Sequence, residues 1–536
     1  MNEPSVVLRP FMNAAVRRLD VMRCVDPQSP QHGSMDREFW NYRTTRGFSS
    51  APFQHAMGAY ALLGVMTTDV EHASLASTAE QLATFWVASR NTNGSANEWY
   101  RNEQSYCATA MGLHALTETA TALRATSGFG RLQPLLGAAV SSAEWLQRRS
   151  NPLAMNQEVA SVSARWSLGT LLGDTTMCER AASDFGNVLK VAEKHGHLLE
   201  SGGFDIGYTL LTLDLLIAAH INGLENTKNL AEILCDRLAG VVSKSGELPF
   251  ALGSRGTSHR FFGGVHYFAR TTGWAAHLVS ILRADHLEQQ AIHSQEYDDR
   301  YLATFASTAL ARAAIYATHD LRESSLDQPR QSTLPEVFER LELPSATVFC
   351  NRKLGSALCY IDVEHRTVNH LGYSVARAES ERLCTLSIGV EASGKTTHSL
   401  VPVSQAMPLV RWETAFYTMT ALCRIPVIAR LVSWNARSRL ARPVGSERGM
   451  FVRICQVSAG QLVVEDCVTL SDRIRSGRIA RLASFPFHSP SALGGYTEVD
   501  EPTQTSSTAA MAVDVFVRRW TVAQVDGRPS VSEVHS

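Results

Sequence analysis

Polar clusters recur at intervals of roughly 50 residues in the first part of the chain, and each stands at the start of an apolar, helix-like run. One helical hairpin with its loops has this period, so the pattern predicts stacked helix pairs. If the first helix of each pair faces inward, all the clusters lie at one rim of one cavity. The period fits a closed toroid and an open α-solenoid equally. The clusters are Gln54-His55, Asn102 to Tyr106, Asn156 to Glu158, Asp205 to Tyr208, and Arg255 to His266.

Hydrophobic periodicity divides the 536-residue chain into five segments. We expect an amphipathic helix and an irregular lead-in over 1–50, helical hairpins over 51–319, and a polar, Pro-bearing linker over 320–345. Short β-type runs punctuated by Gly, Asn and Ser predict an antiparallel β domain over 346–524, and 525–536 reads as a disordered tail. The expected helices are 53–68, 74–90, 104–125, 132–149, 156–173, 178–195, 206–221, 227–243, 265–283 and 297–318.

Composition narrows the classes of partner and location. The net charge is −1, so no global basic field for nucleic acid is present. No run approaches ~18 apolar residues, which argues against a membrane span. Residues 1–26 have no apolar signal-peptide core, so we expect a cytoplasmic protein unless a leader is missing or export takes another route. The ten cysteines stand singly without a CxxC pair, and neither a metal nor a cofactor is expected.

The stretch from Glu200 to His220 carries the clearest chemical signal. Its Gly202-Gly203 pair favours a turn, and Asp205 stands where a helix N-cap would stand. Asp205 and Tyr208 are three residues apart and share a helix face. Two carboxylates and a phenol at a helix start are suited to proton transfer. Alternatively, Asp205 is only a cap and Tyr208 only a packing residue.

The order of these motifs resembles that of the heparinase II/III-like superfamily of polysaccharide lyases, in particular its branch associated with surface-polysaccharide gene clusters. The resemblance covers roughly residues 40–500. It implies an α+β multidomain fold, in which an N-terminal (α/α) toroid of helical hairpins precedes a C-terminal antiparallel β-sandwich. The motifs are Asn102 to Ala110, Asn156 to Glu158, Glu200 to Tyr208, Gly253 to Thr257, and Phe487 to Ala492.

The resemblance implies β-elimination on a polysaccharide that contains uronic acid. Such an enzyme neutralises the uronate carboxylate, removes the adjacent C5 proton and expels the 4-linked oxygen. By resemblance, Asn156 matches the neutralising Asn, but Gln157 stands where the family has His. The base therefore stays open among Tyr208, Tyr106 and His259. Arg255 is expected to hold a sugar carboxylate through two hydrogen bonds.

Further candidates complete the predicted site, and several of the site residues, the histidines among them, have a purely structural alternative. Glu103 and Asp205 are possible acid–base groups. The asparagines can be plain helix caps, the aromatic residues can be core packing, and Arg255 can pair with a neighbouring carboxylate. Expected substrate contacts are Asn102, Gln104, Gln157, Glu200, Trp99, Tyr100 and His266.

Two other functions fit the same sequence. A glycoside hydrolase would use Glu103, Glu200 and Asp205 as its carboxylates. A non-catalytic glycan-binding protein, or a helical scaffold for a partner protein, would need no acid–base groups at the helix starts. The acidic polysaccharide is the expected partner in the first reading, and the sequence does not predict an oligomeric state.

Overall fold

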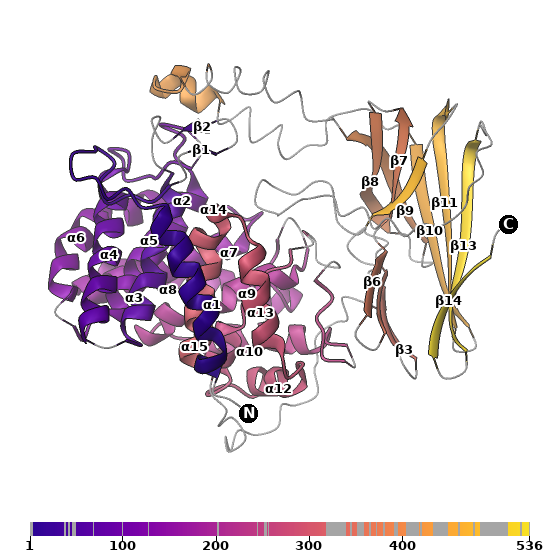
Figure 1. Cartoon of the computed structure of the whole chain (residues 1–536), viewed down its shortest axis with the longest axis horizontal. Coiled ribbons are helices and arrows are strands. Elements are labelled where there is room, and N and C mark those ends of the chain that lie inside the picture. Colours follow the sequence, from indigo (N-terminus) through magenta and orange to yellow (C-terminus); the bar gives the residue numbers. More distant parts are fainter. Residues whose placement is uncertain are drawn as a thin grey trace.

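The computed structural model describes residues 4–317 apart from short gaps, and selected segments beyond them. The gaps are 37–38, 41–42, 45–49, 68, 99, 127, 201–202, 244, 251–254 and 256. Beyond residue 317 it describes residue 418, the segment 421–432 and the strands β3 to β14. Figure 1 shows the helices at one end of the molecule and most of the strands at the other.

The inner helices of the hairpins form a closed ring. Each inner helix contacts the next one along the chain, and the last, α15, packs against the first, α3. This closure decides for a toroid and against an open solenoid. The inner helices are α3 (Met57–Gly64), α5 (Tyr106–Ala122), α7 (Met155–Leu172), α9 (Ile206–Ile221), α11 (Gly263–Phe268) and α15 (Ser307–Tyr316).

The outer helices cover this ring and carry an amphipathic pattern. In α8 the buried residues Ala181, Phe185, Val188 and Ala192 recur at helical spacing, as expected for a helix with one covered face. By contrast, nearly every residue of the inner helix α9 is buried. The outer helices are α4 (Asp69–Ala88), α6 (Gly128–Gln147), α8 (Thr175–His195), α10 (Thr227–Ala239), α12 (Gly273–Ile281), α13 (His286–Glu296) and α1 (Pro4–Val21).

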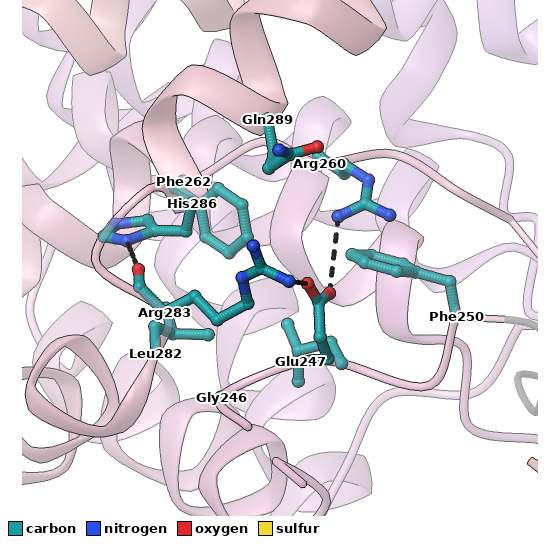
Figure 2. Close-up of a pocket in the computed structure, with 10 residues that line it drawn as sticks. Gly246, Glu247, Phe250, Arg260, Phe262, Leu282, Arg283, His286 and Gln289 are labelled. Carbon is teal, nitrogen blue, oxygen red and sulfur yellow. Dashed lines mark hydrogen bonds and ion pairs between the residues drawn. The ribbon is translucent and has the colours of Figure 1, made fainter. Parts of the chain in front are cut away.

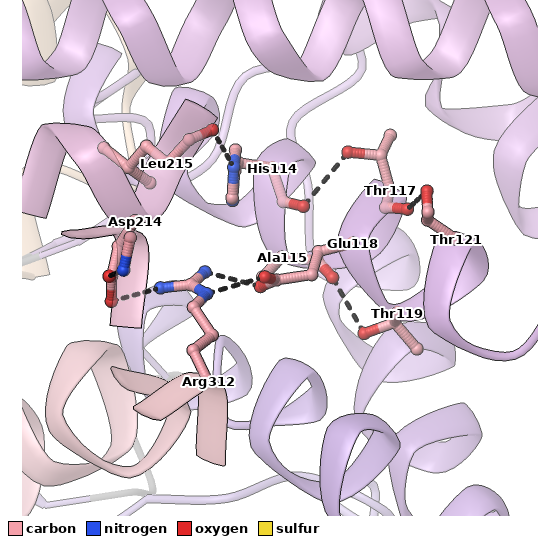
Figure 3. Close-up of polar contacts among 10 residues, drawn as sticks. His114, Ala115, Thr117, Glu118, Thr119, Thr121, Asp214, Leu215 and Arg312 are labelled. Atoms are coloured by element: carbon pink, nitrogen blue, oxygen red, sulfur yellow. Dashed lines mark hydrogen bonds and ion pairs between the residues drawn. The ribbon is translucent and has the colours of Figure 1, made fainter. Parts of the chain in front are cut away.

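A buried ion-pair network joins the inner helices inside the ring (Figure 3). Arg312 on α15 donates two hydrogen bonds to Glu118 on α5, at 2.7 and 2.6 Å, and one to Asp214 on α9 at 3.1 Å. The other oxygen of Asp214 accepts the backbone N–H of Gly264 on α11 at 2.6 Å. Since all three charged side chains are buried, their pairing holds four inner helices in register.

The helix predictions fail in two regions. The predicted helix 53–68 is two helices, α2 (Ala51–Gln54) and α3, and the second region lies between 263 and 296. The predicted helix 265–283 is two helices, α11 and α12, and α13 was not predicted. The break has a long-range cause: the carboxylate of Glu232 on α10 accepts the backbone N–H groups of Gly273 (2.9 Å) and Trp274 (2.8 Å). It thereby caps α12 from another hairpin, which no local pattern reveals.

The predicted helix 297–318 also contains an irregularity. Its first turn, α14 (Asp299–Tyr301), leads into a π-helical turn over Leu302–Ala306 before α15 begins. Such π-helical turns are rare and occur frequently at functional sites.

The strands beyond residue 338 form two antiparallel sheets, in the orders β3-β4-β5-β6 and β12-β7-β8-β9-β10-β11-β13-β14. The packing of these sheets into a sandwich remains a prediction. The strands are β3 (Glu339–Leu343), β4 (Ala346–Cys350), β5 (Cys359–Val363), β6 (Arg366–His370), β7 (Gly372–Ala378), β8 (Glu381–Val390), β9 (Lys395–Val403), β10 (Gly449–Ser458), β11 (Gln461–Ile474), β12 (Arg478–Leu482), β13 (Val513–Val525) and β14 (Arg528–Val534).

Two boundary predictions need correction. The strand β3 lies inside the segment predicted as a linker, 320–345. The tail 525–536, predicted to be disordered, contains β14, which pairs with β13 from Val525↔Arg528 to Arg519↔Val534. The dipeptide Asp526-Gly527 between these strands is typical of a tight hairpin turn and was overlooked.

The lead-in contains α1, as predicted, and a short pair of strands, β1 (Phe39–Trp40) and β2 (Arg43–Thr44). Among the described residues, no helix has both the length and the apolar character that crossing a bilayer requires.

Candidate active site

The starts of α7 and α9 are joined by Glu200. Isolated β-bridges connect Glu200 with Ala154 and with Gly203. The Glu200 carboxylate accepts the backbone N–H of Asn156, in the first turn of α7, at 2.8 Å. Because Ala154, the residue before α7, offers no side-chain cap, Glu200 supplies the acceptor that this helix start needs.

Asp205 is the N-cap of α9 and also fixes a distant loop. One carboxylate oxygen accepts the backbone N–H of Tyr208 at 2.9 Å. The other accepts the backbone N–H groups of Arg255 at 3.0 Å and Thr257 at 3.3 Å. Gly207 permits this approach, since a Cβ there would lie 2.3 Å from the Thr257 carbonyl oxygen. The loop that carries Arg255 is thus held directly over the start of α9.

The hydrogen bonds that Asp205 accepts from this loop bring Arg255 onto the ring of Tyr208. The guanidinium carbon lies 4.4 Å from the ring centroid, which is a cation–π distance. Arg255 Nη1 also lies 3.5 Å from a carboxylate oxygen of Glu200. One cation therefore contacts both a phenol and a carboxyl group that sequence reasoning had placed in the site.

His259 also contacts Tyr208. The two rings meet edge to face with centroids 5.4 Å apart. His259 Nδ1 is 2.8 Å from the hydroxyl of Tyr297, while Nε2 has no hydrogen-bond partner among the described residues. The ring of Tyr301 also contacts His259, at 5.9 Å between centroids. Tyr208 thus contacts a guanidinium and an imidazole, and the imidazole contacts the rings of Tyr297 and Tyr301.

Asn156 presents an amide group without a partner. Its Nδ2 and Oδ1 atoms make no hydrogen bond to any described residue, although the residue is only 1% exposed. A buried amide without hydrogen bonds destabilises the folded protein. Such a group is retained when it serves a function. The surrounding groups are enclosed too: Tyr208 is 7% exposed and the Arg255 side chain 18%. Arg255 is thus the more exposed of these two side chains.

Burial sets the protonation of the titratable groups. It raises the pKa of Glu200 to about 8, although neighbouring Arg255 opposes the shift. It also raises the pKa of Asp205, against three backbone donors. Burial lowers the pKa of His259 to about 3, so its imidazole is neutral at physiological pH. The cluster therefore offers a neutral imidazole and a carboxyl group that gains a proton more easily than usual.

The predicted residues between Tyr100 and Gln104 gather at a different place. Asn102 and Gln104 adopt left-handed backbone angles, with φ of 59° and 57°, which is unusual outside glycine. Asn102 Nδ2 donates to the carbonyl oxygens of Cys423 (3.0 Å) and Arg424 (3.3 Å), and Tyr100 packs against Cys423. This loop thus binds a segment from beyond the helical domain instead of facing Tyr208.

The loop is still connected to Tyr208 and its neighbours Glu200, Arg255 and His259, which we call the Tyr208 cluster. The carboxylate of Glu103, in the loop before α5, accepts the backbone N–H of Glu98 at 2.7 Å. Glu98 in turn accepts the Ser105 hydroxyl at 3.0 Å and forms an ion pair with Arg300. Because Arg300 immediately precedes Tyr301, both groups of residues lie along one rim of the ring.

Other predicted site residues are not brought to the cluster. The ring of Tyr106 packs near that of Trp145, 6.4 Å away, and Gln157 accepts a hydrogen bond from Asn151 at 2.9 Å. His266 is buried in a stacked pair with His286, with 2.8 Å between their Nε2 atoms. Trp99 lies outside the described residues. For Tyr106, Gln157 and His266 the structural alternative fits these contacts.

Sequence reasoning missed Tyr297, Tyr301 and Arg300. All three follow the unpredicted helix α13, and Tyr301 stands directly before the π-helical turn. Asp298 accepts the backbone N–H of Tyr301 at 2.8 Å, so an N-cap followed by Tyr repeats the arrangement of Asp205 and Tyr208. This repeated spacing, an N-cap Asp with a Tyr three residues later, could have identified Tyr301 from the sequence.

A second, small hollow lies beside the segment that carries His259 (Figure 2). Its charged groups are already paired: Glu247 contacts Arg283 at 2.8 Å and Arg260 at 3.7 Å. Within the described part of the chain, no three His, Cys, Asp or Glu side chains are arranged to hold a metal ion. The Tyr208 cluster is thus the better candidate for chemistry.

No protein-family model matches the chain, and neither does any curated protein. Among solved structures, it is similar to the chondroitin AC lyase of Streptomyces coelicolor in complex with chondroitin sulphate, with 11% identity, 90% of this chain and 68% of that chain covered, and a TM-score of 0.48. It is also similar to a Paenibacillus xanthan lyase, with 10% identity, coverage of 89% and 46%, and a TM-score of 0.41. Sequence identities and TM-scores this low support no argument about function, so the function is argued from the site residues.

Proposed function

We propose that the protein cleaves an acidic, uronate-containing polysaccharide by β-elimination at the Tyr208 cluster. The observation that carries this proposal is the contact of Arg255 with both Tyr208 and Glu200, whose carboxylate also accepts the backbone N–H of Asn156. A proton acceptor and two carboxylate-binding groups are the minimum that the reaction requires.

In this proposal the sugar carboxylate binds between Asn156 and Arg255. The Asn156 Nδ2 group, which has no acceptor among the described residues, donates to the sugar carboxylate, and the guanidinium supplies charge-assisted hydrogen bonds. As the C5 proton leaves, negative charge spreads onto the carboxylate, where these donors stabilise it most strongly. The two groups thus lower the barrier and do more than bind the ground state.

Tyr208 is the proposed base among the candidates. The low pKa of His259, about 3, makes its imidazole a poor proton acceptor at neutral pH, and Tyr106 packs near Trp145 instead of entering the cluster. Tyr208 takes the proton as a phenolate, and the adjacent guanidinium of Arg255 stabilises the negative charge that the phenolate carries before the transfer. The same phenol can then return the proton to the leaving sugar oxygen.

The hydrolase alternative has less support. It needs a pair of carboxyl groups with free oxygens, whereas both oxygens of Asp205 accept backbone N–H groups. Glu103 likewise accepts the backbone of Glu98. Both oxygens of Glu200 are engaged as well, one by the backbone N–H of Asn156 and the other by Arg255.

The test is a screen of acidic polysaccharides with two readouts. An elimination creates a C4–C5 double bond conjugated with the carboxylate, so ultraviolet absorbance should rise together with new reducing ends. New reducing ends without that absorbance would indicate hydrolysis. If neither signal appears with any acidic polymer while the folded protein still binds one of them, the glycan-binding alternative is favoured.

A further inference from the structure

Glu200 and a substrate carboxylate would compete for the same cation. Arg255 Nη1 is 3.5 Å from Glu200 Oε2, and the main chain of Arg255 is held by Asp205. Among the described residues, one guanidinium thus faces two carboxyl groups in a buried setting, with Glu200 only 3% exposed. A third negative group entering this space would leave an excess of negative charge, which a low-dielectric site opposes strongly.

The excess of negative charge around Arg255 disappears if a proton binds together with the ligand. We propose that the carboxylate of an acidic sugar binds at Arg255 together with one proton, which is held by Glu200. This inference rests on the proposed function only for the class of ligand. A protonated Glu200 releases Arg255 to the sugar and can itself donate a hydrogen bond to the sugar carboxylate.

Glu200 is suited to this exchange, because burial raises its pKa to about 8. The charged and titratable groups that face it are Arg255 and Asp205, and Tyr208 and His259 lie next to Arg255. His259 is already neutral well below pH 7. Replacing Glu200 leaves Asp205 and Tyr208 in place, so the variant shows how much of the pH dependence of binding comes from Glu200.

The sign of the pH effect follows from linkage. Below about pH 8 the carboxyl group of Glu200 already carries the proton, so affinity is constant there. Above that pH each binding event must take up a proton, and affinity falls by about tenfold per pH unit. At pH 9, one unit above the pKa of about 8, the wild type should bind roughly tenfold more weakly than at pH 7.

The experiment is isothermal titration calorimetry of the full chain with glucuronate, with glucose as the neutral control. Measurements at pH 7 and pH 9, in two buffers of different ionisation enthalpy, count the protons taken up. We expect almost none at pH 7 and about one at pH 9. The Glu200→Gln variant should bind at pH 9 as tightly as at pH 7, whereas Glu193→Gln, on the exposed face of α8, should behave like the wild type.

Each other outcome overturns the inference. These outcomes are glucuronate binding at pH 9 without proton uptake, a full pH effect in Glu200→Gln, and no glucuronate binding at either pH. The proton count needs only the wild type, so it stands even if Glu200→Gln fails to fold. Cleavage with unsaturated products but pH-independent binding would overturn this inference and leave the lyase proposal intact. Proton-coupled binding with no cleavage of any polymer would overturn the lyase proposal and leave this inference intact.

Discussion

The guanidinium carbon of Arg255 lies 4.4 Å from the centre of the Tyr208 ring, although the two residues belong to different helical hairpins. This contact exists because Asp205, three residues before Tyr208, accepts the main-chain N–H of Arg255. The base proposed for catalysis and the cation beside it are thus fixed by one carboxylate.

Removal of the Tyr208 hydroxyl should abolish turnover without unfolding the protein. We expect Tyr208→Phe to lose at least ~10²-fold in kcat, the usual contribution of a positioned base. The matched variant Tyr106→Phe should retain activity, because Tyr106 packs near Trp145. Both are measured by initial rates of unsaturated-product formation, with circular dichroism as the folding control. Equal losses in the two variants would remove Tyr208 from its role.

Replacement of Asn156 should separate function from stability. Its amide has no described partner, so Asn156→Ala removes no hydrogen bond to any described residue and should leave the Tm nearly unchanged. Its kcat should nevertheless fall by about 10²–10³, the usual effect of losing one donor to a developing charge. A large drop in Tm with a matching loss of active protein would instead indicate a structural role.

Gly207 should tolerate no side chain. A Cβ there would lie 2.3 Å from the Thr257 carbonyl oxygen and would push the Arg255 loop away from α9. We expect Gly207→Ala to lose most activity and some stability. Gly186, on α8, has nothing within 4 Å of its Cβ position, so Gly186→Ala should be neutral or stabilise by up to about 1 kcal/mol. Thermal melts and rates of both variants test the close approach.

The buried network inside the ring should dominate the stability of the helical domain. Arg312→Met leaves Glu118 and Asp214 without their cation, which typically costs about 3–5 kcal/mol. The exposed pair of Arg148 and Glu144 provides the control, since Arg148→Met should cost less than about 1 kcal/mol. Denaturant unfolding measures both. Similar costs for the two variants would contradict the assigned role of the network.

Glu200 should also affect the pH dependence of stability in the absence of any ligand. Its folded pKa of about 8 lies above its ordinary value of 4.5, so its contribution is most favourable below pH 4.5 and is lost as pH rises towards 8. The difference in unfolding free energy between Glu200→Gln and the wild type should therefore grow in favour of the variant from pH 5 to 8. A constant difference would show that the pKa of Glu200 is not raised.

The sequence alone determined the hairpin period, the starts of α5, α7 and α9, and the proximity of Asp205 to Tyr208, because all of these depend on local helix geometry. It also pointed to Glu200 and Arg255 as site residues. The closure of the ring depended on contacts between α15 and α3, at opposite ends of the helical domain. The cap that splits α11 from α12 came from Glu232 on another hairpin.

Only the tertiary structure decided which polar residues meet. Asn102 and Tyr208 were both predicted site residues at helix starts, yet Asn102 binds the carbonyl oxygen of Cys423 while Tyr208 meets Arg255. The outcome depended on backbone approaches such as that of Thr257 to Gly207, which involve residues far apart in the chain. A periodic pattern specifies which face of a helix turns inward, but the partner on that face is set by how the hairpins pack around the ring.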